Sequence, residues 1–207
     1  MNGYIDLWVR IDYSVLLEYI DVIRNMGYHA ICVEGLDKRI TRVKGVWVIR
    51  RKTIAGSSEK DVKEKLRGIK QEYPVVVVKP LGIQAARLVA RDNRVDAVLL
   101  DRDSLYYIDK TQATMMKRHS KPLEVPVNTL FSVGDRVRAM MYRRIHLFYQ
   151  YNVPVIYSSS ATSWNEILHP KAIVSIVKTL AGVNGKSVLL SITDYPRALL
   201  LRNGVRV

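Results

Sequence analysis

The sequence has a single cysteine, Cys32, so it cannot form an internal disulfide, which suits a reducing compartment. Cys32 lies in the apolar run AICV, which favours a buried thiol over a nucleophile. Long apolar runs are also missing, because the longest, such as Val75–Val78, are far too short to cross a bilayer. The first residues, MNGYIDLWVRID, lack the basic-then-apolar layout of a signal peptide. We therefore expect a cytoplasmic protein with no membrane anchor.

Histidine is scarce, and no histidine stands at a metal-binding spacing. His29, His119, His146 and His169 form no HxH or HExxH pattern. The sequence also lacks the G-x-S-x-G elbow of serine hydrolases. From these absences we expect no metal, no cofactor and no catalytic residue in this chain.

Acidic residues are outnumbered, since 33 Lys and Arg face 19 Asp and Glu and leave a net charge of +14. A polyanionic partner relieves such self-repulsion, whereas an enzyme for small neutral metabolites has no need of it. The excess is uneven: residues 1–36 carry a net −3, and residues 37–70 carry a net +8. The bases of Lys38–Lys52 are mostly arginines, whose planar fork suits bidentate phosphate contacts. The lysines of Lys60–Lys70 are typical of a solvated helix face.

Short β-rich runs alternate with longer segments of 3.6-residue periodicity, as in parallel strands covered by helices. The predicted strands are Tyr4–Val9, Ala30–Glu34, Val46–Arg51, Val75–Lys79, Ala97–Asp101, Leu123–Asn128 and Val153–Ser158. The predicted helices are Ser14–Met26, Ser58–Tyr73, Gln84–Asn93, Lys110–His119, Val133–Tyr151, Pro170–Leu180 and two short segments between Gly185 and Asn203.

This order predicts an α/β fold, an irregular TIM-like (β/α) barrel of about seven parallel strands. The regularity breaks at a basic loop between the second and third predicted strands. A doubly wound open sheet is the alternative. No repeat, linker or low-complexity segment divides the chain, so we expect residues 1–207 to form a single domain.

In either fold, chemistry gathers at the carboxyl ends of the parallel strands. The predicted strand ends carry a mixed polar ring of Arg10, Glu34, Arg50, Lys79, Asp101, Asn128 and Ser158. We expect Glu34 and Asp101 to pair with Arg10 and Lys79 as structural ions rather than to act as acid and base.

A run of three serines, Ser158, Ser159 and Ser160, follows the last predicted strand. Loops after the last strands of a barrel often bind phosphate, so these hydroxyl and amide groups could hold a phosphate. They could equally satisfy one another. Ser163, followed three residues later by Glu166, predicts a capping box for a short helix at Trp164–Leu168.

Three stretches carry a resemblance to a known family. They are YIDL at Tyr4–Leu7, RVDAVLLD at Arg94–Asp101 and VIYSSSATSWNEILHPKAIVSIVKTLAGV at Val155–Val183. In these stretches, and in length and strand spacing, the chain resembles archaeal ribonuclease P protein component 3, the counterpart of the eukaryotic thirty-kilodalton subunit shared by ribonucleases P and MRP. The resemblance implies an irregular barrel related to the PHP metal-dependent phosphoesterases. It also implies assembly with ribonuclease P RNA and, in the holoenzyme, with precursor tRNA, whose leader the RNA removes. A further implied partner is protein component 2, in a heterotetramer.

In the PHP enzymes the first strand carries a D-x-H-x-H metal-binding pattern. The matching stretch here reads Asp6-Leu7-Trp8-Val9-Arg10, so Trp8 and Arg10 replace both histidines. An indole and a guanidinium cannot ligate a divalent metal, and Arg10 would repel one. The resemblance therefore implies a barrel without its hydrolytic centre.

Our primary hypothesis is an RNA-binding subunit of ribonuclease P that takes part in endonucleolytic tRNA maturation only as part of the holoenzyme. The predicted phosphate contacts are Lys38, Arg39, Arg42, Lys44, Arg50, Arg51, Lys79, Arg87, Ser158, Ser159 and Ser160. A rival is a PHP-like phosphoesterase that uses Asp6, Glu34 and Asp101 with a divalent metal. A third possibility is a subunit that binds only protein and leaves its basic loops solvated.

Overall fold

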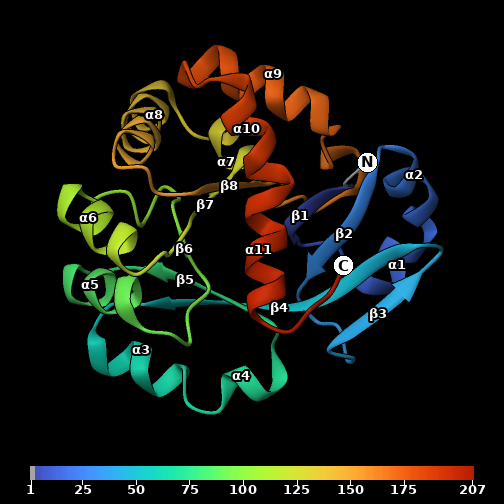
Figure 1. Cartoon of the computed structure of the whole chain (residues 1–207), viewed down its shortest axis with the longest axis horizontal. Coiled ribbons are helices and arrows are strands. Elements are labelled where there is room, and N and C mark those ends of the chain that lie inside the picture. The colour runs from blue at the N-terminus through green and yellow to red at the C-terminus, as the bar shows by residue number, and fades with distance from the viewer. Residues whose placement is uncertain (1–2) are drawn as a thin grey trace.

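A computed structural model describes residues 3–207. Seven parallel strands form a nearly closed barrel with helices around it (Figure 1). In their order around the barrel, the strands are β1 (Tyr4–Val9), β2 (Tyr28–Val33), β4 (Val46–Gly56), β5 (Val75–Pro80), β6 (Ala97–Leu99), β7 (Leu123–Pro126) and β8 (Val155–Ser158). The predicted fold class is confirmed, and the open doubly wound sheet is wrong.

The surrounding helices follow the strands in the alternation that the sequence predicts. They are α1 (Tyr13–Glu18), α2 (Ile20–Asn25), α3 (Glu59–Lys65), α4 (Ile69–Glu72), α5 (Ile83–Arg91), α6 (Lys110–Arg118), α7 (Val127–Ser132), α8 (Asp135–Gln150), the 3₁₀ turn η1 (Trp164–Glu166), α9 (Pro170–Ala181), α10 (Gly185–Ile192) and α11 (Asp194–Arg202). Among the described residues, no helix is both long enough and apolar enough to cross a membrane.

Two predicted helices are divided, and three predicted strands, those that became β6, β7 and β8, are each two residues shorter than expected. The helix expected at Ser58–Tyr73 is interrupted by Gly68, whose φ of +74° is left-handed. The helix expected at Ser14–Met26 is two short helices that meet at Tyr19. The strand expected at Leu123–Asn128 ends at Pro126, and α7 begins at the next residue.

The barrel closes between β8 and β1 through the segment that follows Ser158. Val9 and Ala161 form a parallel bridge. The amide of Ser160 donates to the Trp8 carbonyl at 2.8 Å, and the amide of Arg10 donates to the Ala161 carbonyl at 2.7 Å. The serine run is thus the seam that joins the last strand to the first.

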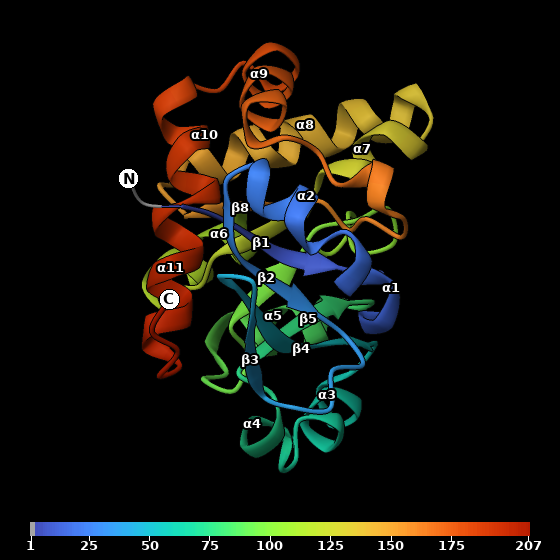
Figure 2. The same ribbon diagram turned by 90° about the vertical axis from the view of Figure 1, so that its right-hand side faces the viewer.

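The basic loop predicted between the second and third strands contains an additional strand. This strand, β3 (Ile40–Val43), pairs antiparallel with the first half of β4 and lies on the outside of the barrel (Figure 2). The two-residue turn at Lys44 and Gly45 has φ values of +47° and +92°, which suits a tight hairpin. β4 is 11 residues long, so it continues five residues beyond its predicted end at Arg51.

The N-terminal mouth of the barrel is covered by α11, which crosses it in Figure 1. Leu199 and Leu200 of α11 pack with the apolar residues of the barrel interior, including Val77 and Leu99. The Arg197 guanidinium donates to the Gly3 carbonyl, just before β1, at 3.2 Å. Because α11 closes this end, the C-terminal ends of the strands form the mouth that stays open to solvent.

Cys32 lies in the same interior cluster and has no exposed surface. Burial raises the pKa of its thiol, so the thiolate is disfavoured at neutral pH. The prediction that Cys32 is buried is confirmed.

Candidate nucleic-acid interface

The hairpin of β3 and β4, with the loop before it, carries exposed cations. Lys38 and Arg39 lie in the loop after β2, and both are exposed. Arg42 on β3 is also exposed, and its guanidinium lies 5.1 Å from the centre of the Trp47 ring. In residues 3–207, none of these three side chains forms an ion pair with a carboxylate. Their charges are therefore available to an external anion.

Two further cations share one aromatic support on the outer face of β4. The Arg50 guanidinium lies 4.3 Å from the centre of the Tyr73 ring and donates to the Tyr73 hydroxyl at 3.3 Å. The Lys52 ammonium lies 5.8 Å from the same ring centre. The Arg50 amide also donates to the Arg39 carbonyl at 2.8 Å, which ties the loop to the strand. We call Lys38, Arg39, Arg42, Arg50 and Lys52 the basic hairpin.

Lys44, at the turn of the hairpin, already has a partner. Its ammonium lies 2.5 Å from the Asp21 carboxylate of α2. The hydrogen bond from Lys44 lowers the pKa of Asp21, so the carboxylate is ionised and compensates the lysine charge. Lys44 thus anchors the hairpin tip to α2, and the cations that lack such a partner are the stronger candidates for phosphate contact.

The prediction that Arg51 contacts phosphate is wrong. Its side chain has no exposed surface, and its guanidinium forms a bidentate ion pair with Glu124, at 2.6 and 2.8 Å. Successive side chains of a strand point to opposite faces, and β4 extends well past this residue. Arg50 therefore points outward, and Arg51 points into the barrel.

Lys79 and Arg87, two other predicted phosphate contacts, are each engaged by acidic residues. The Lys79 ammonium lies 3.3 Å from Asp101 and 3.0 Å from Asp103. The Arg87 guanidinium lies 2.6 Å from Asp109. The predicted structural pairing of Asp101 with Lys79 is confirmed. A phosphate at either cation would have to compete with a carboxylate already in contact.

The serine run belongs to the barrel seam rather than to an exposed phosphate loop. Ser158 and Ser159 are fully buried, so predicting their side chains as phosphate contacts was wrong. The Ser159 amide donates to Asp6 at 3.0 Å, and its hydroxyl donates to the Trp8 carbonyl and accepts from the Ala161 amide. The Ser160 amide donates to the Trp8 carbonyl, so it is not available to a phosphate, although Ser160 lines a cleft at the open mouth. The polar groups of Ser159 and the Ser160 amide are therefore satisfied by Asp6, Trp8 and Ala161, whereas the Ser158 hydroxyl is buried without a partner among the described residues.

The predicted capping box also differs from the structure. Ser163 precedes the single turn η1, but its side chain caps no backbone amide of that turn. Glu166 instead accepts from the amide and the hydroxyl of Thr162, at 2.7 and 2.8 Å. The carboxylate thus closes a loop with Thr162, one residue earlier than the motif predicts.

The three carboxylates of the rival phosphoesterase hypothesis lie in different surroundings. Asp6 is buried at the seam, where burial raises its pKa to about 6. Glu34 is exposed, and Asp101 is paired with Lys79. Within residues 3–207, no three His, Cys, Asp or Glu side chains form a group that could hold a metal ion. The barrel interior contains instead the ion pair of Arg51 and Glu124. The Arg51 guanidinium lies 4.6 Å from the centre of the Trp8 ring.

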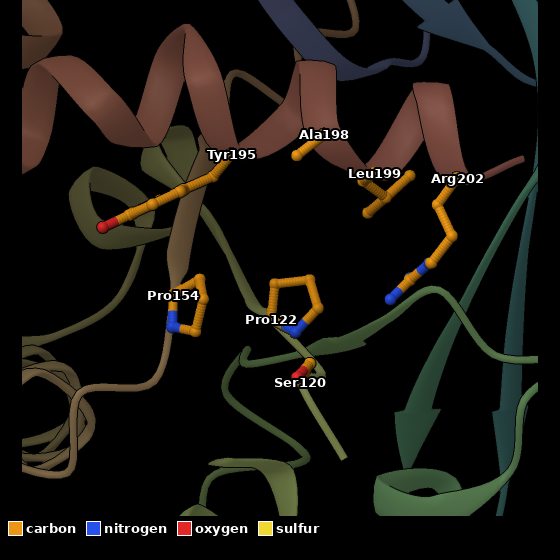
Figure 3. Close-up of a pocket in the computed structure, with 7 residues that line it drawn as sticks. All are labelled: Ser120, Pro122, Pro154, Tyr195, Ala198, Leu199 and Arg202. Carbon is orange, nitrogen blue, oxygen red and sulfur yellow. The ribbon is translucent and has the colours of Figure 1, made fainter. Parts of the chain in front are cut away.

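The two mouths of the barrel carry cavities of different character. A pocket of about 240 Å³ lies under α11, where Tyr195 and Arg202 extend toward Pro154, Pro122 and Ser120 (Figure 3). Its lining is mostly apolar, so it is a packing gap at the closed mouth. The open mouth has a larger cleft of about 430 Å³, whose lining is polar and includes Arg10, Asn128, Thr129 and Ser160.

Sequence reasoning missed the aromatic supports of the basic hairpin. Arg42 and Trp47 are directly opposed in the pairing of β3 with β4, so the hairpin register would have identified them. Tyr73 is the last residue of the predicted helix Ser58–Tyr73, and no local sequence pattern links it to Arg50.

Comparison with known proteins gives a consistent result. The family model described as RNase P subunit p30 matches residues 3–207. Ribonuclease P protein component 3 of Aeropyrum pernix is 28% identical over 212 residues, which cover 96% of this chain and 97% of that protein.

Two solved structures illustrate the shared fold. A chain in the cryo-EM structure of archaeal ribonuclease P with mature tRNA is similar with a TM-score of 0.78 at 16% identity, covering 96% of this chain and 90% of that chain. An ochratoxinase of A. niger has a TM-score of 0.67 at 8% identity, over 96% of this chain and 71% of that chain. At such low identities the likeness concerns the barrel fold alone.

Proposed function

Because this chain belongs to the RNase P subunit p30 family, we propose that its basic hairpin supports the RNA of ribonuclease P, while that RNA performs the cleavage. As a subunit of the ribonuclease P holoenzyme, the protein takes part in tRNA processing. The observation that carries the proposal is the basic hairpin itself. Five cations lie on β3, β4 and the loop before β3, two of the arginines are supported by aromatic rings, and the described residues provide none of the five with a carboxylate partner.

The hairpin is suited to the sugar–phosphate backbone rather than to particular bases. A-form RNA presents its phosphates and a shallow minor groove, so proteins recognise it mainly by shape and charge. Stacking on Trp47 and Tyr73 orients the guanidinium groups of Arg42 and Arg50 and so reduces the entropy lost on binding. Cations placed between neighbouring RNA helices reduce their repulsion. The RNA then needs less magnesium to fold.

The proposal is tested by changing Lys38, Arg39 and Arg42 to Ala together in the reconstituted holoenzyme. Each phosphate contact contributes a slope of roughly 0.7–0.9 to the fall of log affinity with log salt concentration. We expect the RNA-binding slope to decrease by about 2–3 and the magnesium concentration for half-maximal cleavage to rise. Filter binding of the RNA and a magnesium titration of precursor tRNA cleavage measure the two effects.

A matched control removes three exposed cations away from the hairpin, by changing Lys60 of α3, Arg67 between α3 and α4, and Arg118 of α6 to Ala. These residues form no ion pair within the described part of the chain, so the loss of net charge is the same. We expect the control to keep most of the wild-type salt slope and magnesium requirement. Equal effects of the two triple variants would show that only overall charge matters and would refute a specific role of the hairpin.

We also propose protein component 2 as a partner, in a heterotetramer, and the cytoplasm as the compartment. Support for a protein interface comes from Leu180 of α9 and Leu189 of α10, which are 47% and 43% exposed on two helices that pack together. Changing both to Asp should abolish co-elution with component 2 in size-exclusion chromatography. Val15→Asp on α1, where Val15 is 43% exposed, is the control. Unchanged co-elution of the double variant would exclude this face.

A further inference from the structure

The open mouth of the barrel carries a feature that the basic hairpin does not explain. The cleft there lies between the end of β1, helix α7 and the segment after β8, and its lining includes Arg10, Thr129, Phe131 and Ser160. Its volume of about 430 Å³ is within the range of roughly 300–1,000 Å³ usual for small-ligand sites. Ser160 at its edge has a φ of +52°, a strained conformation for a residue with a side chain.

Exposed aromatic side chains gather at this same end of the barrel. Tyr106, Phe131 and Trp164 are 65%, 47% and 47% exposed. They follow β6, β7 and β8 respectively, so all three lie in connections at the C-terminal ends of strands. Trp164 stacks on Tyr19 with ring centres 5.3 Å apart, which holds its ring in place. Solvent-exposed aromatic rings beside cations are the usual platform for unpaired bases.

Arg10 provides the cation at the cleft. Its side chain is exposed, and its guanidinium lies 5.6 Å from the centre of the Trp8 ring. In the described residues it forms no ion pair, so it differs from Lys79 on the same mouth. The one carboxylate of the cleft lining, Glu166, accepts two hydrogen bonds from Thr162 and forms no ion pair with Arg10. The positive charge of Arg10 is therefore available to a phosphate.

We propose that this cleft binds one unpaired nucleotide of a single-stranded RNA segment. The Phe131 ring stacks on the base, Arg10 contacts the phosphate, and the hydroxyls of Thr129 and Ser160 are placed for hydrogen bonds to the sugar or the base. This inference rests on the proposed function in that the partner is RNA. It concerns a different surface and a different form of RNA, because the hairpin fits duplex phosphates and the cleft fits a splayed base.

The test uses the full chain, a fluorescein-labelled hexa-adenylate and a labelled 12-base-pair RNA duplex, with binding followed by fluorescence anisotropy. Removing one stacking platform costs about 1–3 kcal/mol, so Phe131→Ala should weaken binding of the hexa-adenylate about 5- to 150-fold. Phe131→Trp should retain binding, and Phe131→Leu should lose it because it keeps bulk but no ring. Binding of the duplex should be unchanged in all three variants.

Leu201→Ala is the matched control, because Leu201 is 49% exposed, close to the 47% of Phe131, but lies on α11. It should bind both RNAs as the wild type does. The proposal is overturned if the wild type does not bind the hexa-adenylate, if Phe131→Ala binds it equally well, or if that variant loses duplex binding to the same extent. Failure of the Lys38, Arg39 and Arg42 triple variant to weaken duplex binding would count against the hairpin and leave the cleft unaffected.

Discussion

The buried pair of Arg51 and Glu124 allows a quantitative test of the barrel interior. Neither side chain has any exposed surface, and two hydrogen bonds join them, at 2.6 and 2.8 Å. The guanidinium also donates to the Leu7 carbonyl and, at 3.2 Å, to the Thr53 hydroxyl. Each charge is thus compensated only by groups inside the protein. The perturbations are Arg51→Met, Glu124→Leu and the two changes combined.

Removing one member leaves the other as an unpaired charge in the interior. Such a loss costs about 3–5 kcal/mol of unfolding free energy, whereas replacing both members by apolar residues of similar size is often close to neutral. If the two losses were independent, the double variant would be less stable by about 6–10 kcal/mol. We expect it to be more stable than either single variant, which gives a large and favourable coupling between the two positions.

Urea unfolding followed by tryptophan fluorescence measures all four proteins, because Trp8 lies directly against the Arg51 guanidinium. The same samples are then tested for RNA binding. Because Arg51 is inaccessible, the double variant should bind duplex RNA with wild-type affinity. Additive losses in stability would refute the account of the pair as a closed unit. Weaker RNA binding by a folded double variant would refute the assignment of Arg51 to the interior.

Three other predictions concern single positions. Burial raises the pKa of Asp6 to about 6 from an ordinary 3.8, so the folded protein binds a proton that the unfolded chain releases, and stability falls as pH rises from about 4 to 6. Asp6→Asn should remove this fall. In urea unfolding at pH 7 the variant should be more stable than the wild type by on the order of 2–3 kcal/mol. Burial lowers the pKa of Lys121 to about 8 from 10.5, so wild-type stability should rise between those pH values, and Lys121→Met should show no such rise. Gly45 has a φ of +92° at the hairpin turn, so Gly45→Ala should cost about 1–2 kcal/mol, measured by thermal unfolding; no loss would contradict the turn geometry.

The barrel was predictable because most of its strands are short runs of apolar, β-branched residues that can be recognised in the sequence alone. Runs such as Val75–Val78 are apolar on both faces, which occurs when helices cover one face and the barrel interior the other. β3 was not predictable in this way, because Ile40–Val43 is only four residues long and pairs at an edge, where no alternation of burial develops. The position of α11 across the N-terminal mouth was not predictable either, because its pattern of apolar residues is the one expected of any helix on the barrel surface.

The candidate site was predictable in composition but not in geometry. Arg50 and Arg51 are adjacent arginines in the same sequence context, yet Arg50 points outward to Tyr73 and Arg51 points inward to Glu124. Arg51 is an interior residue because β4 continues past it to Gly56, beyond the predicted end of the strand. The serine run shows the same limit. From the sequence alone, its polar groups fit a phosphate-binding loop and internal hydrogen bonds equally well. The Ser159 amide donates to Asp6, which is 153 residues away in the sequence, so no local pattern could predict this bond.

The proposed binding of RNA at the open mouth follows from the charges around Trp8. The guanidinium groups of Arg10 and Arg51 lie 5.6 and 4.6 Å from the centre of its ring. Of the carboxylates at this end of the barrel, Glu124 pairs with Arg51, Asp6 is buried at the seam, and Glu166 accepts two hydrogen bonds from Thr162. Arg10 is left exposed and has no carboxylate partner among the described residues, so its charge favours a phosphate over a divalent cation at this position.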